Sequence, residues 1–316
     1  MQGPVIGALG ELLVEFICDA LDGRNLRAAS YTGPFPSGAP GIFIDQAARV
    51  GARAVFAGAV GDDAFGVVLR DRLVASGVSR AMIAVVPGVP TGSAFVSYNS
   101  DGSRDFVFNI AHSAAAHFPD GAAAIAGFLA AGVQVFHISG STLGDPGMRA
   151  RALKVCRSLR AAGVEISIDP NIRTELLTDA GYLAVVRELI AMAAYVLPSD
   201  ADADLLFDGG FLDWAPGLIG AGAKVVVLKR GAAGAIAMDA GGRVVDLPGH
   251  AVPVVDPTGA GDCFCATLVT LLAGGRDLAV ALRHANAAGA LAVGQLGPMA
   301  GNSDMATITA FLEGAA

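Results

Sequence analysis

The stretch that decides the fold reads Asp256-Pro257-Thr258-Gly259-Ala260-Gly261-Asp262. Residues 252–255 before it are apolar and predict a strand. After it, apolar residues recur at helical spacing and end at Gly274-Gly275, a good helix stop. The apolar face of that helix consists of Phe264, Leu268, Leu271 and Leu272. Two glycines and an aspartate therefore lie where a strand passes into a helix.

This position predicts an anion site. The first backbone N–H groups of a helix have no partner within the helix and bind anions such as phosphate. Glycines allow the ligand a close approach. Asp262, in the first turn, is close enough to take a proton from a nucleophile that attacks the phosphate. A plain glycine-rich turn with a helix-dipole acid is the alternative, but the sequence contains neither a P-loop nor a G-x-G-x-x-G after a strand.

Composition narrows the class of protein. The chain has 316 residues, of which 53% are hydrophobic and 16% charged, and its net charge is −8. Such a chain folds around a large core. The acidic balance argues against a nucleic-acid partner, which needs a basic face. No apolar stretch reaches the roughly 18 residues of a membrane span, and no signal peptide is recognised. Four cysteines without C-x-x-C spacing predict reduced thiols and a cytoplasmic location.

The rhythm of the chain predicts an α/β fold. Short β-branched runs, such as residues 5–9 and 134–138, alternate with alanine-rich helical stretches. This pattern predicts a mostly parallel sheet with helices on both faces, and ligands bind beyond the carboxyl ends of its strands. Residues of about 11–36 and 91–110 break the rhythm and predict a small β-sheet over the site, including a hairpin with its turn at Asp101-Gly102. Nothing divides the chain, so we expect a single domain over residues 1–316.

Several further motifs complete a resemblance to the ribokinase-like (PfkB-type) carbohydrate kinases, whose D-T-x-G-A-G-D signature matches residues 256–262 except at Pro257. The resemblance covers nearly the whole chain. It implies a three-layer α/β/α fold with a β-sheet lid, nearest to tagatose, fructose and ketodeoxygluconate kinases. The motifs are Gly10-Glu11-Leu12-Leu13-Val14-Glu15-Phe16, Ser37-Gly38-Ala39-Pro40, Ala47-Ala48-Arg49-Val50-Gly51, Gly58-Ala59-Val60-Gly61-Asp62-Asp63-Ala64-Phe65-Gly66, Asp169-Pro170-Asn171-Ile172-Arg173, Lys229-Arg230-Gly231-Ala232-Ala233-Gly234 and Ala285-Asn286-Ala287-Ala288-Gly289-Ala290.

The resemblance implies a role for each site residue. Asp262 would be the general base, and the N–H groups of Gly259, Ala260 and Gly261 would hold the transferred phosphoryl group, with Arg173 meeting phosphate or sugar. ATP and Mg²⁺ are the implied cofactors. The implied ATP-binding residues are Ser199, Lys229, Gly231, Gly234, Thr258 and Asn286. The implied substrate-binding residues are Glu15, Gly38, Ala39, Phe108 and Asn109.

The chain departs from the family pattern in three places. The metal-organising N-x-x-E is Ser199-Asp200-Ala201-Asp202 here, which leaves Asp202 as the candidate magnesium residue. A usual sugar-supporting asparagine is Ile42. In the lid, Ile110 and Ala111 stand where ketodeoxygluconate kinases bring a Tyr and a basic residue to the acid, and a buried charge needs pairing.

We therefore expect an ATP-dependent kinase for a neutral ketohexose such as tagatose or fructose. The alternatives are the same fold acting on 2-keto-3-deoxygluconate, ribose or a nucleoside, and a non-catalytic sugar- or nucleotide-binding protein. Because a small exposed sheet is marginal alone and leaves open edges, we also expect a homodimer paired through the lids.

Overall fold

The computed structural model describes residues 3–117, 121–173, 176–177 and 179–314. Within these residues nine strands form one sheet, in the order β13-β12-β11-β10-β9-β8-β1-β4-β5. Neighbours are parallel except at β11–β12 and β12–β13. Its strands are β1 (Val5–Leu9), β4 (Arg53–Gly61), β5 (Ser79–Val86), β8 (Val135–Ser139), β9 (Glu165–Asp169), β10 (Tyr195–Val196), β11 (Val225–Lys229), β12 (Ala235–Asp239) and β13 (Val244–Leu247). The predicted α/β fold with a mostly parallel sheet is confirmed.

Helices cover both faces of this sheet, because successive side chains of a strand point to opposite faces. Ile6 and Ala8 of β1 pack in a core with α1, α2, α8 and α9. Val5 and Leu9 pack in a second core, with α3 to α7. The helices are α1 (Ala39–Arg49), α2 (Ala64–Ala75), α3 (Gly121–Ala130), α4 (Pro146–Ala161), α5 (Ala180–Met192), α6 (Asp200–Leu206), α7 (Phe211–Gly220), α8 (Ala260–Ala273), α9 (Leu278–Ala292) and α10 (Met305–Gly314). Among the described helices none is long and apolar enough to cross a membrane.

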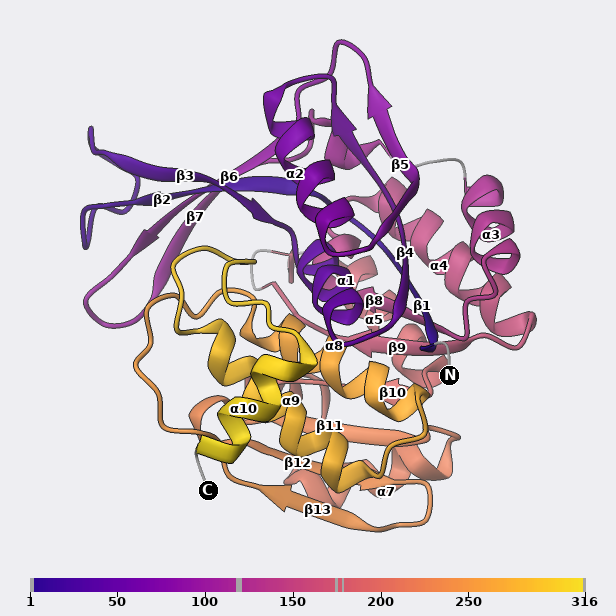
Figure 1. The fold of residues 1–316 in the computed structure, drawn as a ribbon. Helices are drawn as coiled ribbons and strands as arrows, with labels where there is room; N and C mark the ends of the chain where they lie inside the picture. The colour runs from indigo at the N-terminus through magenta and orange to yellow at the C-terminus, as the bar shows by residue number, and fades with distance from the viewer. Residues whose placement is uncertain (1–2, 118–120, 174–175, 178, 315–316) are drawn as a thin grey trace.

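A second sheet of four strands projects beyond the large one (Figure 1). Its order is β3-β2-β6-β7, and β6 and β7 form the predicted hairpin. The strands are β2 (Leu13–Cys18), β3 (Tyr31–Ser37), β6 (Gly92–Tyr98) and β7 (Arg104–Asn109). They lie in the two segments that the sequence predicted. We call this second sheet the lid sheet.

One local prediction is wrong. Residues 252–255 form no strand and lead to the signature loop, residues 256–262, as irregular chain. Pro253 cannot donate to a β-ladder, and Val254 and Val255 are more than half exposed. The N–H groups of Val255 and Asp256 instead donate to the carbonyl of Val293, at 2.8 and 3.1 Å. Residues 252–255 are mostly apolar, but they add no strand to the large sheet, whose edge on this side is β13.

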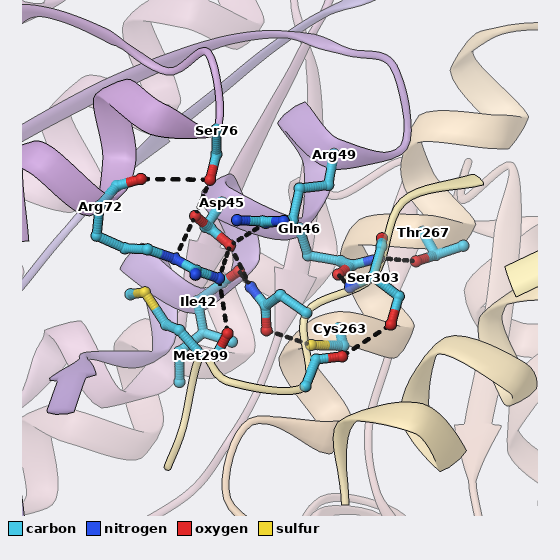
Figure 2. A network of polar contacts seen from close by, with 12 residues as sticks. Ile42, Asp45, Gln46, Arg49, Arg72, Ser76, Cys263, Thr267, Met299 and Ser303 are labelled. Atoms are coloured by element: carbon cyan, nitrogen blue, oxygen red, sulfur yellow. Dashed lines mark hydrogen bonds and ion pairs between the residues drawn. The ribbon is translucent and has the colours of Figure 1, made fainter. Parts of the chain in front are cut away.

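A buried polar network fixes the surroundings of the signature loop (Figure 2). The carboxylate of Asp45, fully buried in α1, accepts hydrogen bonds from Arg49 Nε at 2.9 Å, Arg72 Nε at 3.0 Å and Asn302 Nδ2 at 2.7 Å. Asn302 Oδ1 in turn lies 3.0 Å from the thiol of Cys263, which donates to it from the first turn of α8. The network therefore ties α1 and α2 to α8 and to the segment before α10.

Candidate active site

The start of α8 presents free backbone donors. Gly259 caps the helix at φ 85°, and a Cβ there would lie 2.5 Å from the carbonyl oxygen of Pro298, so this position requires glycine. The first hydrogen bond inside the helix runs from Cys263 N–H to Gly259 C=O. The N–H groups of Ala260, Gly261 and Asp262 make no hydrogen bond within the described residues. The free donors at this helix start agree with the sequence, and the binding of an anion by them stays a prediction.

Asp262 lies beside these donors. It is 8% exposed, and its carboxylate makes no hydrogen bond or ion pair to any residue in the described ranges. Burial, reinforced by the negative charge of Asp169, raises its pKa to about 8, although Lys229 and Arg173 pull it down. A carboxylate with free oxygens and a pKa near neutrality suits a general base.

Two strands of the large sheet bring charges to the same edge, because carboxyl ends of parallel strands meet there. Asp169 ends β9 and Lys229 ends β11, and Lys229 Nζ lies 2.5 Å from Asp169 Oδ2. The same Nζ is 3.5 Å from the Cys265 sulfur in α8. Lys229 was expected among the ATP-binding residues, but its ammonium group is held in this internal ion pair. Contact with a nucleotide stays a prediction.

Glu11, just after β1, is a site residue that sequence reasoning did not single out. Its carboxylate is buried and accepts hydrogen bonds from Ser141 Oγ at 2.7 Å and Thr142 Oγ1 at 2.9 Å. Burial raises the pKa of Glu11, whereas these bonds and the charge of Arg173 lower it. In the sequence, the position of Glu11 directly after a buried strand was the feature that could have identified it as a site residue.

The lid sheet contributes Glu15, which faces the site. Glu15 is 3% exposed; Oε2 accepts a hydrogen bond from Ser37 Oγ at 3.1 Å, and Oε1 has no partner among the described residues. Burial, reinforced by the charge of Asp256, raises its pKa to about 7. An unpartnered buried acceptor is costly, and a ligand hydroxyl would satisfy it. Gly38 and Ala39, beside Ser37, form the tight entry into α1, where a Cβ on Gly38 would lie 2.5 Å from Glu11 C=O.

The register of the strands in the lid sheet determines which side chains lie on the same face as Glu15. Glu15 pairs with Ala94 and Ala94 with Phe108, so Phe108 shares the face of Glu15. Its ring stacks on Phe106 and is 45% exposed. Asn109 is the next residue and lies on the opposite face, where its Nδ2 is 3.5 Å from Ser93 Oγ. The structure thus brings Phe108 to the side of Glu15 and does not bring Asn109 there.

Arg173 and Arg104 supply positive charge on the side of the site where Glu15 lies. The guanidinium of Arg173 makes no hydrogen bond or ion pair to another described residue, yet its charge lowers the pKa of Glu11, Glu15 and Asp262. Arg104 begins β7, on the same face as Phe108, and its charge also lowers the pKa of Glu15. The sequence-based expectation considered Ile110 and Ala111 alone, whereas the lid sheet has a basic residue, Arg104, six positions before Ile110.

Ile42 is a packing residue. It is 2% exposed and lies in a small core with Cys263, Ala292 and Met299. A Cβ on Gly259 would be 3.2 Å from Ile42 Cγ2, so the isoleucine supports the signature loop from the α1 side.

A comparison with known proteins fits this geometry. The model of the "pfkB family carbohydrate kinase" matches residues 7–305. The chain belongs to the pfkB family. The kinase prediction and the ribokinase-like fold prediction are therefore confirmed.

Known relatives and solved structures that resemble this pfkB-family kinase agree with the family assignment. Fructokinase-2 of Oryza sativa subsp. japonica is 29% identical, over 91% of this chain and 87% of its own. A protein from E. coli provisionally named ribokinase II is 36% identical, with a TM-score of 0.91 over 98% of this chain and 99% of its own. A fructokinase from Vibrio cholerae O395, solved with fructose, ADP and a potassium ion, is 25% identical, with a TM-score of 0.82 over 99% of both chains.

The predicted nucleotide side of this kinase surrounds the 3₁₀ turn Gly231–Ala233. Gly231 has φ 53° and open space around it, whereas a Cβ on Gly234 would lie 2.2 Å from Leu247 C=O. Asn286, in α9, is 8% exposed and donates from Nδ2 to Pro248 C=O at 3.1 Å. Gly234 and Asn286 thus shape the loop, and Gly231 leaves room beside it.

The candidate metal residue belongs to a helix cap. Ser199 and Asp202 form the capping box of α6, and Asp202 Oδ1 also accepts the N–H of Ile172 at 2.8 Å. Within the described residues no group of three His, Cys, Asp or Glu side chains could hold a metal. An ionised carboxylate has about four acceptor positions, and Asp202 uses three. One acceptor position of Asp202 is therefore left, and a role for it at the magnesium ion of a nucleotide stays a prediction.

Proposed function

We propose that this kinase transfers the γ-phosphoryl group of Mg–ATP to a hydroxyl of a neutral ketohexose, fructose or tagatose. The observation that carries the proposal is the Asp262 carboxylate beside the N–H groups of Ala260 and Gly261, all without partners among the described residues. The fructokinase relatives, and the ATP and Mg²⁺ bound to the E. coli protein at 35% identity, support it.

In this proposal each residue has one task. The hydroxyl of the sugar gives its proton to Asp262 as its oxygen bonds to the γ-phosphorus, and the bond from that phosphorus to the ADP oxygen breaks. The N–H groups of residues 259–261 hold the phosphoryl oxygens, which is a preorganised electrostatic contribution. Bound Mg²⁺ neutralises phosphate charge. Glu15 accepts a second sugar hydroxyl, and Phe108 covers the sugar.

The charge balance favours a neutral sugar. On this side, Arg173 is charge-coupled to Glu11, Glu15 and Asp262, and Arg104 and Asp256 are coupled to Glu15. Asp169 and Lys229 are coupled to Asp262 as well. Among these described residues, five carboxyl groups outnumber three cationic side chains. An added carboxylate on the substrate would be desolvated near like charges, which is unfavourable. A sugar acid such as 2-keto-3-deoxygluconate is the second candidate, because Arg173 has no partner in the described residues.

The test is ADP release from Mg–ATP with fructose, tagatose, ribose, ketodeoxygluconate, adenosine or buffer alone. The proposal predicts strong release with a ketohexose. Release only with the sugar acid would replace the proposed substrate and keep the kinase. No ADP release with any of these compounds, together with tight sugar binding in calorimetry, would contradict phosphoryl transfer.

The remaining expectations concern assembly and location. We propose a homodimer through the lid sheets, because β7 is an edge strand with Val107 and Phe108 each nearly half exposed. Sedimentation velocity that gives a monomer at micromolar concentration would contradict it. We also propose a cytoplasmic location, which fits four free, buried cysteines. Fractionation of the native cells tests it.

A further inference from the structure

The end of the lid hairpin is hydrogen-bonded to the signature loop. Tyr98 is the last residue of β6 and Arg104 the first of β7, and the two are cross-strand partners. Tyr98 OH donates to Asp256 Oδ1 at 2.5 Å and lies 3.3 Å from Thr258 Oγ1. Arg104 Nη1 donates to the same Thr258 Oγ1 at 3.1 Å. These contacts join segments more than 150 positions apart in the chain.

Asp256 is the centre of this connection. It is fully buried; Oδ1 also accepts the N–H of Thr258 at 2.8 Å, and Oδ2 accepts the N–H of Gly297 at 3.0 Å. The carboxylate therefore holds the turn directly before Gly259, which caps α8. Hydrogen bonds to an ionised carboxylate are among the stronger ones. A lid residue that bonds Asp256 thus acts on the backbone that presents the anion-binding N–H groups.

The electrostatics keep the Tyr98 hydroxyl in its bonding form. Burial and the hydrogen bond to Asp256 raise the pKa of Tyr98, so its hydroxyl remains a donor. The guanidinium of Arg104 lies 5.5 Å from the centre of the Phe106 ring. Glu15, on the same face of the lid sheet, is charge-coupled to Asp256 and to Arg104. The expected sugar contact and the hairpin contact therefore share one set of charges.

We infer that Tyr98 and Arg104 are positioning residues that couple the seating of the lid sheet over the sugar to the order of residues 256–259. Because the lid hairpin is hydrogen-bonded to the signature loop, the phosphoryl site is complete only when the lid sheet covers the sugar. When these hydrogen bonds are lost, the γ-phosphoryl group passes more often to the oxygen of water, giving ADP and inorganic phosphate. The inference rests on the proposed function for its kinetic part, and on geometry alone for its structural part.

The structural test is hydrogen–deuterium exchange on the full-length protein, comparing wild type with Tyr98→Phe. Loss of the hydroxyl should speed exchange of the Thr258 and Gly297 N–H groups, which Asp256 holds. The matched control is Tyr31→Phe, in β3 of the same sheet, where Tyr31 OH donates to Asn25 Oδ1. Unchanged exchange at both amides in Tyr98→Phe would overturn the inference, whatever the sugar assay gives.

The kinetic test measures ADP formation with and without fructose. A misplaced site costs about 100-fold in rate, so Tyr98→Phe should lower kcat by about 10- to 100-fold and raise the ratio of water to sugar transfer about 10-fold, with KM for ATP unchanged. Arg104→Lys, which keeps a cationic donor, should lose less than Arg104→Ala. Wild-type kcat and ratio in Tyr98→Phe would overturn the coupling. If wild type itself phosphorylates no sugar, the proposed function fails and the exchange test still decides the hairpin contact.

Discussion

Lys229 Nζ lies 2.5 Å from Asp169 Oδ2, and this ion pair packs against the first turns of α8. Burial lowers the pKa of Lys229, but the negative charges of Asp169 and Asp202 outweigh it and raise the pKa. The two charges of this pair act on Asp262 in opposite directions: Asp169 raises the pKa of Asp262, and Lys229 lowers it. A buried pair of this kind is a tuning element for the proposed base as well as a structural contact.

Lys229→Met tests that tuning. Removing one partner of a buried pair costs about 3–5 kcal/mol of stability, and it removes a charge that favours ionised Asp262. We expect a lower Tm and a rate-against-pH curve moved to higher pH. The matched control is Lys224→Met, whose exposed pair with Glu165 should contribute at most about 1 kcal/mol. An unmoved pH curve in a folded Lys229→Met would contradict the tuning role.

The pH dependence of the wild type follows from Asp262. With a pKa of about 8, the carboxylate is mostly protonated at acidic pH and cannot accept a proton. We expect kcat/KM for fructose to rise with pH and to level off above about pH 8. Glu15, with a pKa of about 7, sharpens the rise if its ionised form binds the sugar. Initial rates across buffers of constant ionic strength measure this, and a flat profile would contradict it.

The same pKa makes a prediction about stability. The unfolded chain loses the Asp262 proton near its ordinary pKa of 3.8, whereas the folded protein keeps it to about pH 8. Between these values the contribution of Asp262 to stability falls as pH rises, by at most about 1.4 kcal/mol per pH unit. Asp262→Asn removes the penalty. The variant should exceed wild type in Tm by a margin that grows from pH 4 to pH 8. A constant difference would show that the carboxylate is not desolvated.

The network around Asp45 predicts a large loss. Asp45→Ala leaves the partly buried donors of Arg72 and Arg49 and the buried amide of Asn302 without their acceptor, which should cost about 3–5 kcal/mol. Urea unfolding measures the loss. Glu188→Ala removes an exposed pair with Arg157 and should cost no more than about 1 kcal/mol. Equal midpoints for the two variants would mean that the network adds no stability.

The sequence predicted what local pattern determines. Alternating strands and helices indicated the fold class, and the order of residues 256–262 predicted the helix start beside Asp262. Contacts between residues that are far apart in the sequence could not be predicted in this way. Nothing local joins Tyr98 to Asp256, or Lys229 to Asp169, because each pair meets only through the packing of the two sheets and α8. The face of Asn109 depended on strand register, which alternates with every residue.

The measurement that tests the central claim most directly is fructose-dependent ADP formation by wild type and Asp262→Asn, with ATP affinity measured on both. Asp304→Asn is the control, because Asp304 is an exposed cap of α10 that Asn replaces well. We predict a kcat about 100- to 10,000-fold lower in Asp262→Asn with unchanged ATP affinity. Turnover near the wild-type rate in Asp262→Asn would contradict Asp262 as the base.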